Sequence, residues 1–157
     1  VLTIDHALRF DIFRRERLPE IEARGGEGYV LKDPRAPYTQ DRPNSGGPAL
    51  KVKFIESATC RVAGGNGTKR SVALELKGED DAWVPVGNVT IPANAEIPAA
   101  GDLVEVEYLY AYEGGSLFQP VFRGKRHDID EDACRVAQLK FKGGGMAAEP
   151  EAETLGL

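Results

Sequence analysis

The sequence predicts a mainly β protein with a helical N-terminus. Strand-like runs separated by glycine-rich turns fill the C-terminal two thirds, whereas helical spacing of apolar residues is confined to the first 25 positions. With 157 residues and 41% hydrophobic content, the chain can form one domain, or one small domain with a piece of another.

Two short helices are expected before residue 26. Asp5 can cap a helix that begins at His6, in which apolar residues up to Phe13 recur on one face. The stretch "LPEIEARGG" predicts a second helix with Pro19 near its start, and the glycine pair 25–26 ends it.

Two strands are expected next, around a long loop. "GYVLK" (28–32) and "ALKVKF" (49–54) flank a proline- and glycine-rich segment, and loops of this length are more often functional than not. Alternation places Leu50, Val52 and Phe54 inward and Lys51 and Lys53 outward.

Five further runs predict a small closed or partly open barrel: 59–64, 69–77, 83–91, 103–112 and 117–124. In the fourth run the alternation predicts a core face and a mixed face. The core face holds Val104, Val106, Tyr108, Tyr110 and Tyr112, and the mixed face holds Leu103, Glu105, Glu107 and Leu109. The tail from 143 has few large apolar residues and is predicted to be disordered.

Charge is distributed unevenly along the chain, although its net value is only -5. Residues 28–70 carry eight Lys or Arg against three acids, whereas residues 71–157 carry seven against sixteen. A second basic cluster, "RGKRH" (123–127), lies inside the acidic half. The net charge argues against a general nucleic-acid coat, but the basic middle suits phosphate contacts.

Cysteine usage and hydropathy indicate a cytoplasmic protein. Cys60 and Cys134 are far apart and lack a C-x-x-C pattern, so we expect two reduced, structural thiols and no zinc site. No apolar run reaches the roughly 18–20 residues that a membrane span needs, and no signal-peptide pattern opens the chain.

The two N-terminal strands also carry candidate chemistry. Glu27 precedes a glycine at the start of one strand, Lys32 ends that strand, and Lys51 and Lys53 project from the next. A carboxylate with several lysines can hold a divalent metal together with a phosphate, because Mg²⁺ prefers oxygen ligands and lysines bind phosphate as point charges.

The order "EGYVLK", loop, "LKVKF" resembles two C-terminal motifs of the covalent nucleotidyltransferases, most closely ATP-dependent DNA ligases. The resemblance covers roughly residues 20–142. It implies the end of a nucleotidyltransferase (ATP-grasp-like) domain at 1–56, an OB-fold barrel at 57–142 and a tail at 143–157.

The resemblance also implies roles for residues. Glu27 would contact Mg²⁺ and the nucleotide, Lys51 and Lys53 would hold the α-phosphate of ATP, and Lys32 would face the same site. Near the barrel's end, Arg126 and Asp128 match the R-x-D of a third ligase motif, although Ile129 stands where that motif has lysine. Arg123, Lys125 or Arg126 could each orient the pyrophosphate. The alternative is that this exposed basic strand end only contacts DNA phosphates.

The family's nucleophilic lysine, in K-x-D-G, is absent from the sequence. We therefore expect that the chain alone does not form lysyl-AMP. Either it is the C-terminal part of a longer bacterial or phage ligase, which the lack of an initial Met favours, or it is a remnant that binds nucleic acid without catalysis.

The expected activity is ATP-dependent sealing of nicked duplex DNA through lysyl-AMP and DNA-adenylate, by a monomer that contacts no membrane. The expected partner in the protein is the remainder of the nucleotidyltransferase domain. RNA ligases and capping enzymes share the first two motifs, so RNA remains possible. A non-enzymatic OB module is the other alternative, with Trp83 or the tyrosines 108, 110 and 112 stacking on bases.

Overall fold

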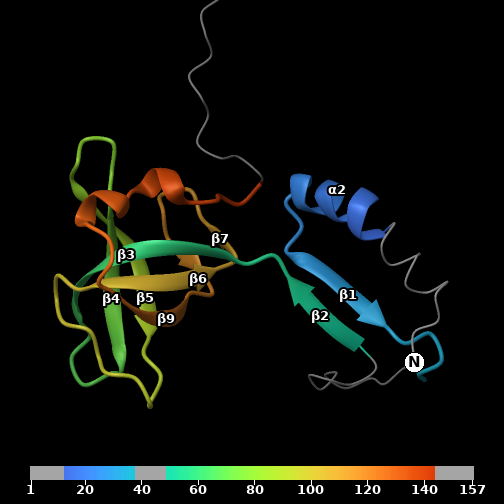
Figure 1. The fold of residues 1–157 in the computed structure, drawn as a ribbon, viewed down its shortest axis with the longest axis horizontal. Coiled ribbons are helices and arrows are strands. Elements are labelled where there is room, and N and C mark those ends of the chain that lie inside the picture. The colour runs from blue at the N-terminus through green and yellow to red at the C-terminus, as the bar shows by residue number, and fades with distance from the viewer. Residues whose placement is uncertain (1–12, 38–48, 144–157) are drawn as a thin grey trace, which may run out of the picture. The chain divides into compact units, whose positions relative to one another are not determined.

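The computed structural model describes residues 13–37 and 49–143, and these fall into two compact units that divide between Phe54 and Ile55 (Figure 1). The helix predicted from His6, most of the long loop and the tail fall almost wholly outside the described residues. Among the described residues, no helix has the length and hydropathy to cross a membrane.

The first unit contains residues 13–16 in helical conformation, helix α2 (Leu18–Ala23) and the antiparallel strands β1 (Gly28–Lys32) and β2 (Ala49–Lys53). Pro19 lies in the first turn of α2. At its end the N–H groups of Gly25 and Gly26 donate to the carbonyls of Glu22 and Ile21, both at 2.9 Å. This is a Schellman cap, with Gly25 at a φ of 74°.

The second unit is a five-stranded barrel in the order β5-β4-β3-β6-β9, all pairs being antiparallel, and β5 and β9 approach each other to close it. The strands are β3 (Glu56–Gly65), β4 (Ser71–Lys77), β5 (Trp83–Thr90), β6 (Leu103–Tyr108) and β9 (Val121–Arg126). A hairpin of β7 (Tyr110–Ala111) and β8 (Leu117–Phe118) forms a separate sheet.

The barrel core follows the predicted two-residue alternation. Every second residue of β4 and β6 is buried, including Leu74, Leu76, Val104 and Val106. Register shifts between β3 and β4, β4 and β5, and β6 and β9 bend the strands around this core.

The fourth and fifth predicted strands are each interrupted. The fourth strand is interrupted at Leu109, which shifts the alternation of its side chains. Leu109, Tyr110 and Ala111 are therefore all buried, and Tyr112 is 41% exposed. The expectation that Tyr112 lies in the core and Leu109 on the opposite face is therefore wrong. In the fifth run, Gln119 has a φ of 53° and Pro120 has no N–H, which separates β8 from β9.

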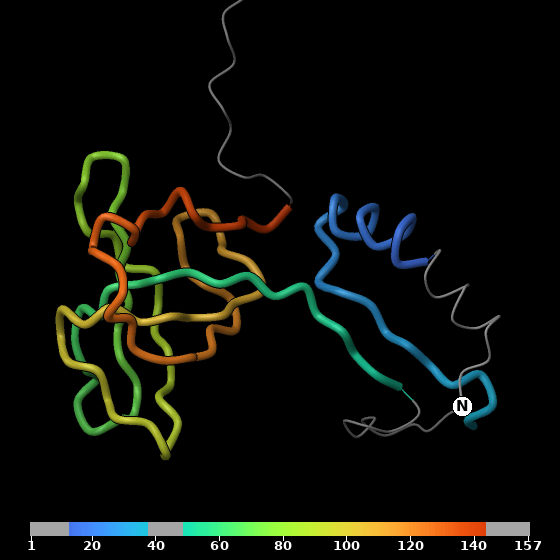
Figure 2. The backbone as a smooth tube through the Cα atoms, viewed as in Figure 1, coloured from blue at the N-terminus to red at the C-terminus, as the bar shows by residue number. Residues whose placement is uncertain are grey.

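A C-terminal strap, residues 131–142, completes the barrel (Figure 2). It contains the 3-10 turns η1 (Glu131–Ala133) and η2 (Val136–Gln138), and it buries Cys134 and Leu139. Cys60 and Cys134 are free thiols, and burial raises the pKa of Cys60 to about 12 and that of Cys134 to about 11. Both are therefore protonated near neutral pH.

Gln138 fastens the strap to β3. Strand β4 pairs with β3 only from Arg61 onward, so the outer edge of Thr59 has no strand neighbour. The Gln138 side chain takes that place: its Oε1 accepts from the Thr59 N–H at 3.1 Å, and its Nε2 donates to the Thr59 carbonyl at 3.1 Å.

We expect Gln138→Ala to lower the free energy of unfolding by about 1–3 kcal/mol, because both backbone groups of buried Thr59 lose their partner. Urea unfolding of the barrel unit, followed by its spectroscopic signal, measures this change in the free energy of unfolding. Asn94→Ala, an exposed amide in the β5–β6 loop, is the control and should change it by less than about 0.5 kcal/mol. Equal midpoints for the two variants would contradict the role of Gln138.

Candidate active site

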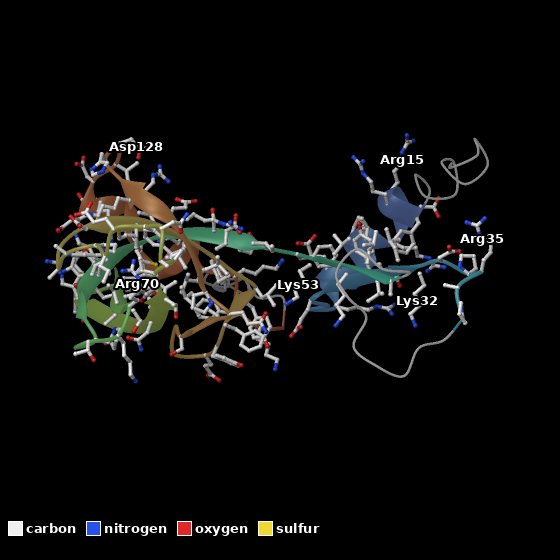
Figure 3. The ribbon with its side chains drawn as sticks, turned by 90° about the horizontal axis from the view of Figure 1, so that it is seen from below. Arg15, Lys32, Arg35, Lys53, Arg70 and Asp128 are labelled. Atoms are coloured by element: carbon white, nitrogen blue, oxygen red, sulfur yellow. The ribbon has the colours of Figure 1, made fainter. Side chains whose placement is uncertain are left out.

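The register of β1 and β2 places three lysines on one face. Gly28, Val30 and Lys32 lie opposite Lys53, Lys51 and Ala49, and directly opposed residues of an antiparallel pair project to the same side. Lys32, Lys51 and Lys53, here called the lysine face, therefore project together, and all three are exposed. Figure 3 shows Lys32 on the side of the strand pair away from Arg15.

The other face of the pair is apolar. Tyr29 packs there against the ring of Phe13, at 5.7 Å between centroids, and against Phe54 at 6.3 Å. Leu50 and Val52 were expected to point inward. Leu50 is 48% exposed and Val52 37% exposed, so the described residues leave both side chains largely uncovered. A two-stranded sheet has too little surface to bury both.

Glu27 lies at the end of the strand pair where Lys53 is found. It precedes β1, it is exposed, and its carbonyl accepts a hydrogen bond from the Phe54 N–H at 3.0 Å. Neighbouring positions on one strand face are about 7 Å apart, as are diagonal ones across a pair. Lys51 can therefore share one phosphate with Lys53 or with Lys32, which lie at opposite ends of the lysine face. Glu27 lies one residue before Gly28, so strand alternation places its side chain toward the opposite face.

The glycine after Glu27 is required by the close approach of the two strands. Gly28 has a φ of 149°, and a Cβ on it would lie 2.0 Å from the carbonyl oxygen of Val52 and 2.8 Å from the Cα of Lys53. No other residue type fits this geometry without displacing β2. The Glu-Gly pair of the motif thus fixes the pairing that creates the lysine face.

In the barrel unit, Arg126 ends β9 and forms a fork with Asp128. Its Nε and Nη2 donate to Asp128 Oδ1 and Oδ2, both at 2.7 Å, and its Nη1 donates to Glu105 Oε2 at 2.5 Å. The hydrogen bonds that Arg126 donates to these carboxylates raise the pKa of Arg126, and those that Asp128 accepts lower the pKa of Asp128. Both groups remain charged.

The other two cations of this cluster are also paired. Arg123 donates to Glu107, and Lys125 Nζ lies 2.9 Å from Asp102 Oδ2, a bond that raises the pKa of Lys125 and lowers that of Asp102. The three cations at 123, 125 and 126 thus face five carboxylates: Glu96, Asp102, Glu105, Glu107 and Asp128. These three cations and their carboxylate partners together carry a net negative charge, although the stretch 123–127 reads as basic in the sequence.

The aromatic candidates divide into buried and exposed groups. Tyr108 is 1% exposed and its hydroxyl accepts the Lys140 N–H at 3.0 Å, so its ring cannot stack on a base. Trp83 begins β5, and its ring is half-buried with the Arg61 guanidinium 4.7 Å from its centroid. Tyr112 is exposed, with Lys142 Nζ 5.9 Å from its ring centroid.

A cavity of about 420 Å³ opens elsewhere in the barrel unit. Its walls include Val84, Val136 and Phe141, and none of the predicted site residues lines it. It therefore does not bear on the chemistry predicted from the sequence.

No protein-family model and no curated protein sequence matches the chain. Among solved structures, a Lig E DNA ligase, described as binding DNA with a minimal scaffold, is 25% identical with a TM-score of 0.50. The match covers 71% of this chain and 45% of that ligase. Structures named Pmar-Lig_Pre and Pmar-Lig_PreS3 are each 21% identical with a TM-score of 0.60, covering 80% and 79% of this chain and 32% of their own.

The chain has the fold of the C-terminal part of a DNA ligase. The predicted fold class, mainly β with an N-terminal helix and an OB-fold barrel, is confirmed. The chain spans less than half the length of these matched structures.

Within this ligase fold, two structural features were missed by reasoning from the sequence. The contact of Glu105 with Arg126 was not predicted, although the alternation of Glu105 and Glu107 with buried valines already placed acids on the outer face of that strand. Arg70 was counted in the basic middle, but its guanidinium bonds the carbonyls of Pro92 at 2.8 Å and Ala95 at 2.5 Å. These hydrogen bonds attach Arg70 to the β5–β6 loop.

Proposed function

We propose that this chain is the C-terminal part of an ATP-dependent DNA ligase, which joins a 5′-phosphate to a 3′-hydroxyl at a nick in duplex DNA during repair or replication. The observation that carries the proposal is the register of β1 and β2, which places Lys32, Lys51 and Lys53 on one exposed face. The ligase fold of the chain supports it.

The lysine face suits the phosphates of ATP. Nucleotidyl transfer depends mainly on positioning and on neutralising charge, so Lys51 and Lys53 would hold the α-phosphate and Lys32 would add to the same field. These cations lie on neighbouring positions of a hydrogen-bonded strand pair, which limits the reorganisation needed when phosphate binds.

Mg²⁺ would be held only in part by this chain. Glu27 offers one exposed carboxylate, and the described residues contain no group of three or more His, Cys, Asp or Glu that could hold a metal ion. One carboxylate with the substrate's phosphates is a common way to bind Mg²⁺, which would neutralise charge on those phosphates.

Arg126 would act on the leaving pyrophosphate, with Asp128 holding its guanidinium. Three of its five N–H donors go to Asp128 and Glu105, which leaves one on Nη1 and one on Nη2 for a ligand. Arg123 and Lys125 remain the alternatives, each with a carboxylate partner of its own.

The nucleophilic lysine would come from a part of the polypeptide outside these 157 residues, because no K-x-D-G occurs in them. The exposed apolar side chains on β2 support this proposal. Leu50 and Val52, on the face of the pair that holds Tyr29, are 48% and 37% exposed, as expected of a face that another part of a protein covers.

DNA contacts of the barrel would lie away from the net negative cluster formed by residues 123–126 and their carboxylate partners, because phosphate attraction dominates affinity for DNA. Lys69, in the β3–β4 turn, and Lys142, beside Tyr112, are exposed cations on other parts of the unit. A non-catalytic nucleic-acid-binding module is the second candidate function, and the exposed Tyr112 with Lys142 is the observation that favours it.

Labelled ATP separates these functions. With Mg²⁺ and α-labelled ATP, the complete polypeptide should acquire a covalent label and seal a nicked duplex, while the 157-residue chain should acquire none. A label on the chain itself would contradict the assignment of the nucleophile. An unlabelled complete polypeptide that still binds single strands would favour the second candidate.

A further inference from the structure

Arg126 is held by two carboxylates that differ in how firmly they are fixed. Asp128 follows the end of β9 and its side chain is 66% exposed. Glu105 lies on β6, which hydrogen-bonds to β3 on one side and β9 on the other, and its side chain is only 26% exposed. The barrel therefore fixes the position of Glu105 more tightly than that of Asp128.

The pairing of β6 with β9 explains why Glu105 reaches Arg126. The residue directly opposite Glu105 is Gly124, which has no side chain, and Arg126 is the diagonal neighbour two positions along β9. On the other side, Thr59 of β3 lies opposite Glu105, with its hydroxyl 3.5 Å from the same Oε2 that accepts from Arg126. The Glu105 carboxylate thus connects three adjacent strands.

We infer that Glu105 is a positioning residue, which fixes the guanidinium of Arg126 on the barrel so that its two remaining N–H donors are aimed at phosphate oxygens. The inference rests on the function proposed above. Without Glu105, the guanidinium would keep only Asp128 as its anchor, and the pair could swing together on the residues that follow β9.

The charge of Glu105 is a separate matter from its position. Two carboxylates on one guanidinium leave that group of three side chains net negative, which opposes the approach of phosphate. Glutamine at position 105 would keep an acceptor oxygen while removing the charge. Alanine would remove both, so these two variants separate positioning from charge.

The first test uses the 157-residue chain and needs no activity. The Nη1–H of Arg126, which donates to Glu105, should give a resolved, slowly exchanging NMR signal. Glu105→Ala should broaden it or speed its exchange, while Glu105→Gln should preserve it. Glu107→Ala is the matched control, because Glu107 lies two residues along the same strand face and contacts Arg123 instead. An unchanged Arg126 signal in Glu105→Ala would overturn the inference.

The second test uses the complete polypeptide and measures single-turnover labelling with ATP. Glu105→Ala should lower the rate constant by about tenfold or more with little change in the ATP concentration at half-saturation, as expected when a catalytic group is misplaced. Glu105→Gln should stay within about threefold of the parent, as should Glu107→Ala.

An Arg126→Ala background separates the inference from the proposed function. There, Glu105→Ala should cause no further loss, and a full additional loss would overturn the inference. If Arg126→Ala alone leaves labelling unchanged, the proposed role of Arg126 fails, and the inference fails with it. If Arg126→Ala is slow and Glu105→Ala is normal, only the inference fails.

Discussion

Replacing Lys51 or Lys53 with alanine in the complete polypeptide is expected to slow covalent labelling by ATP, and nick sealing with it, by about 100-fold or more. A preorganised cation that stabilises charge developing on a phosphate contributes at this level. Both residues lie on the exposed lysine face, so their removal leaves no cavity in a core. The free energy of unfolding should therefore change little.

Two controls separate phosphate binding from general electrostatics. Lys69→Ala removes the same charge from an exposed turn of the barrel unit, and it should leave labelling within about threefold of the parent if only local contacts matter. Lys51→Arg keeps the charge but changes the geometry, because a guanidinium is a planar fork and not a compact ammonium. It should recover part of the lost rate.

Quench-flow labelling at saturating and subsaturating ATP gives the rate constant and the half-saturation concentration for each variant. A loss confined to the half-saturation concentration would indicate ground-state binding of ATP alone. Near-normal labelling by both alanine variants would refute the phosphate role of the lysine face and remove the observation that carries the proposed function.

Local alternation made the strands predictable. In β4 and β6 every second residue is a valine, leucine or tyrosine that the barrel buries, and the lysine alternation of β2 likewise survived in the structure. The interruption at Leu109 was not predicted, because the run 103–112 continues to look apolar and alternating. The interruption at Gln119 did have a signal in the sequence, since Pro120 cannot donate to a strand ladder. The positive φ of Gln119 comes from the tertiary path of the chain and has no signal in residue type.

The electrostatics of the site depended on strand order, which the sequence does not state. Reading along the chain, Arg123, Lys125 and Arg126 form a basic cluster, but β9 lies beside β6, whose outer face carries Glu105 and Glu107. A charge count over a linear window cannot detect neutralisation by a strand some 20 residues away. Similarly, Gln138 of the strap accepts a hydrogen bond from Thr59 of β3, which lies 79 residues earlier in the sequence.

Gly28→Ala is the second change expected to have a large effect, because it acts on the register that creates the lysine face. The new Cβ would lie 2.0 Å from the Val52 carbonyl oxygen, and a φ of 149° disfavours any side chain. Strain of this kind costs about 1–3 kcal/mol, and overpacking adds a similar amount. A two-stranded sheet is marginal on its own, so we expect β2 to separate from β1 at this end.

Amide hydrogen exchange in the 157-residue chain measures this separation directly. In Gly28→Ala, the amides of the β1–β2 pair should exchange faster while those of β4 and β6 stay protected, because the barrel is a separate compact unit. Gly65→Ala is the control, since a Cβ there would meet nothing within 4 Å. In the complete polypeptide, Gly28→Ala should slow ATP labelling as severely as Lys53→Ala, since Lys53 is the residue paired with Gly28. Normal labelling with fast exchange in β1 and β2 would show that the lysine face acts without the observed strand pairing.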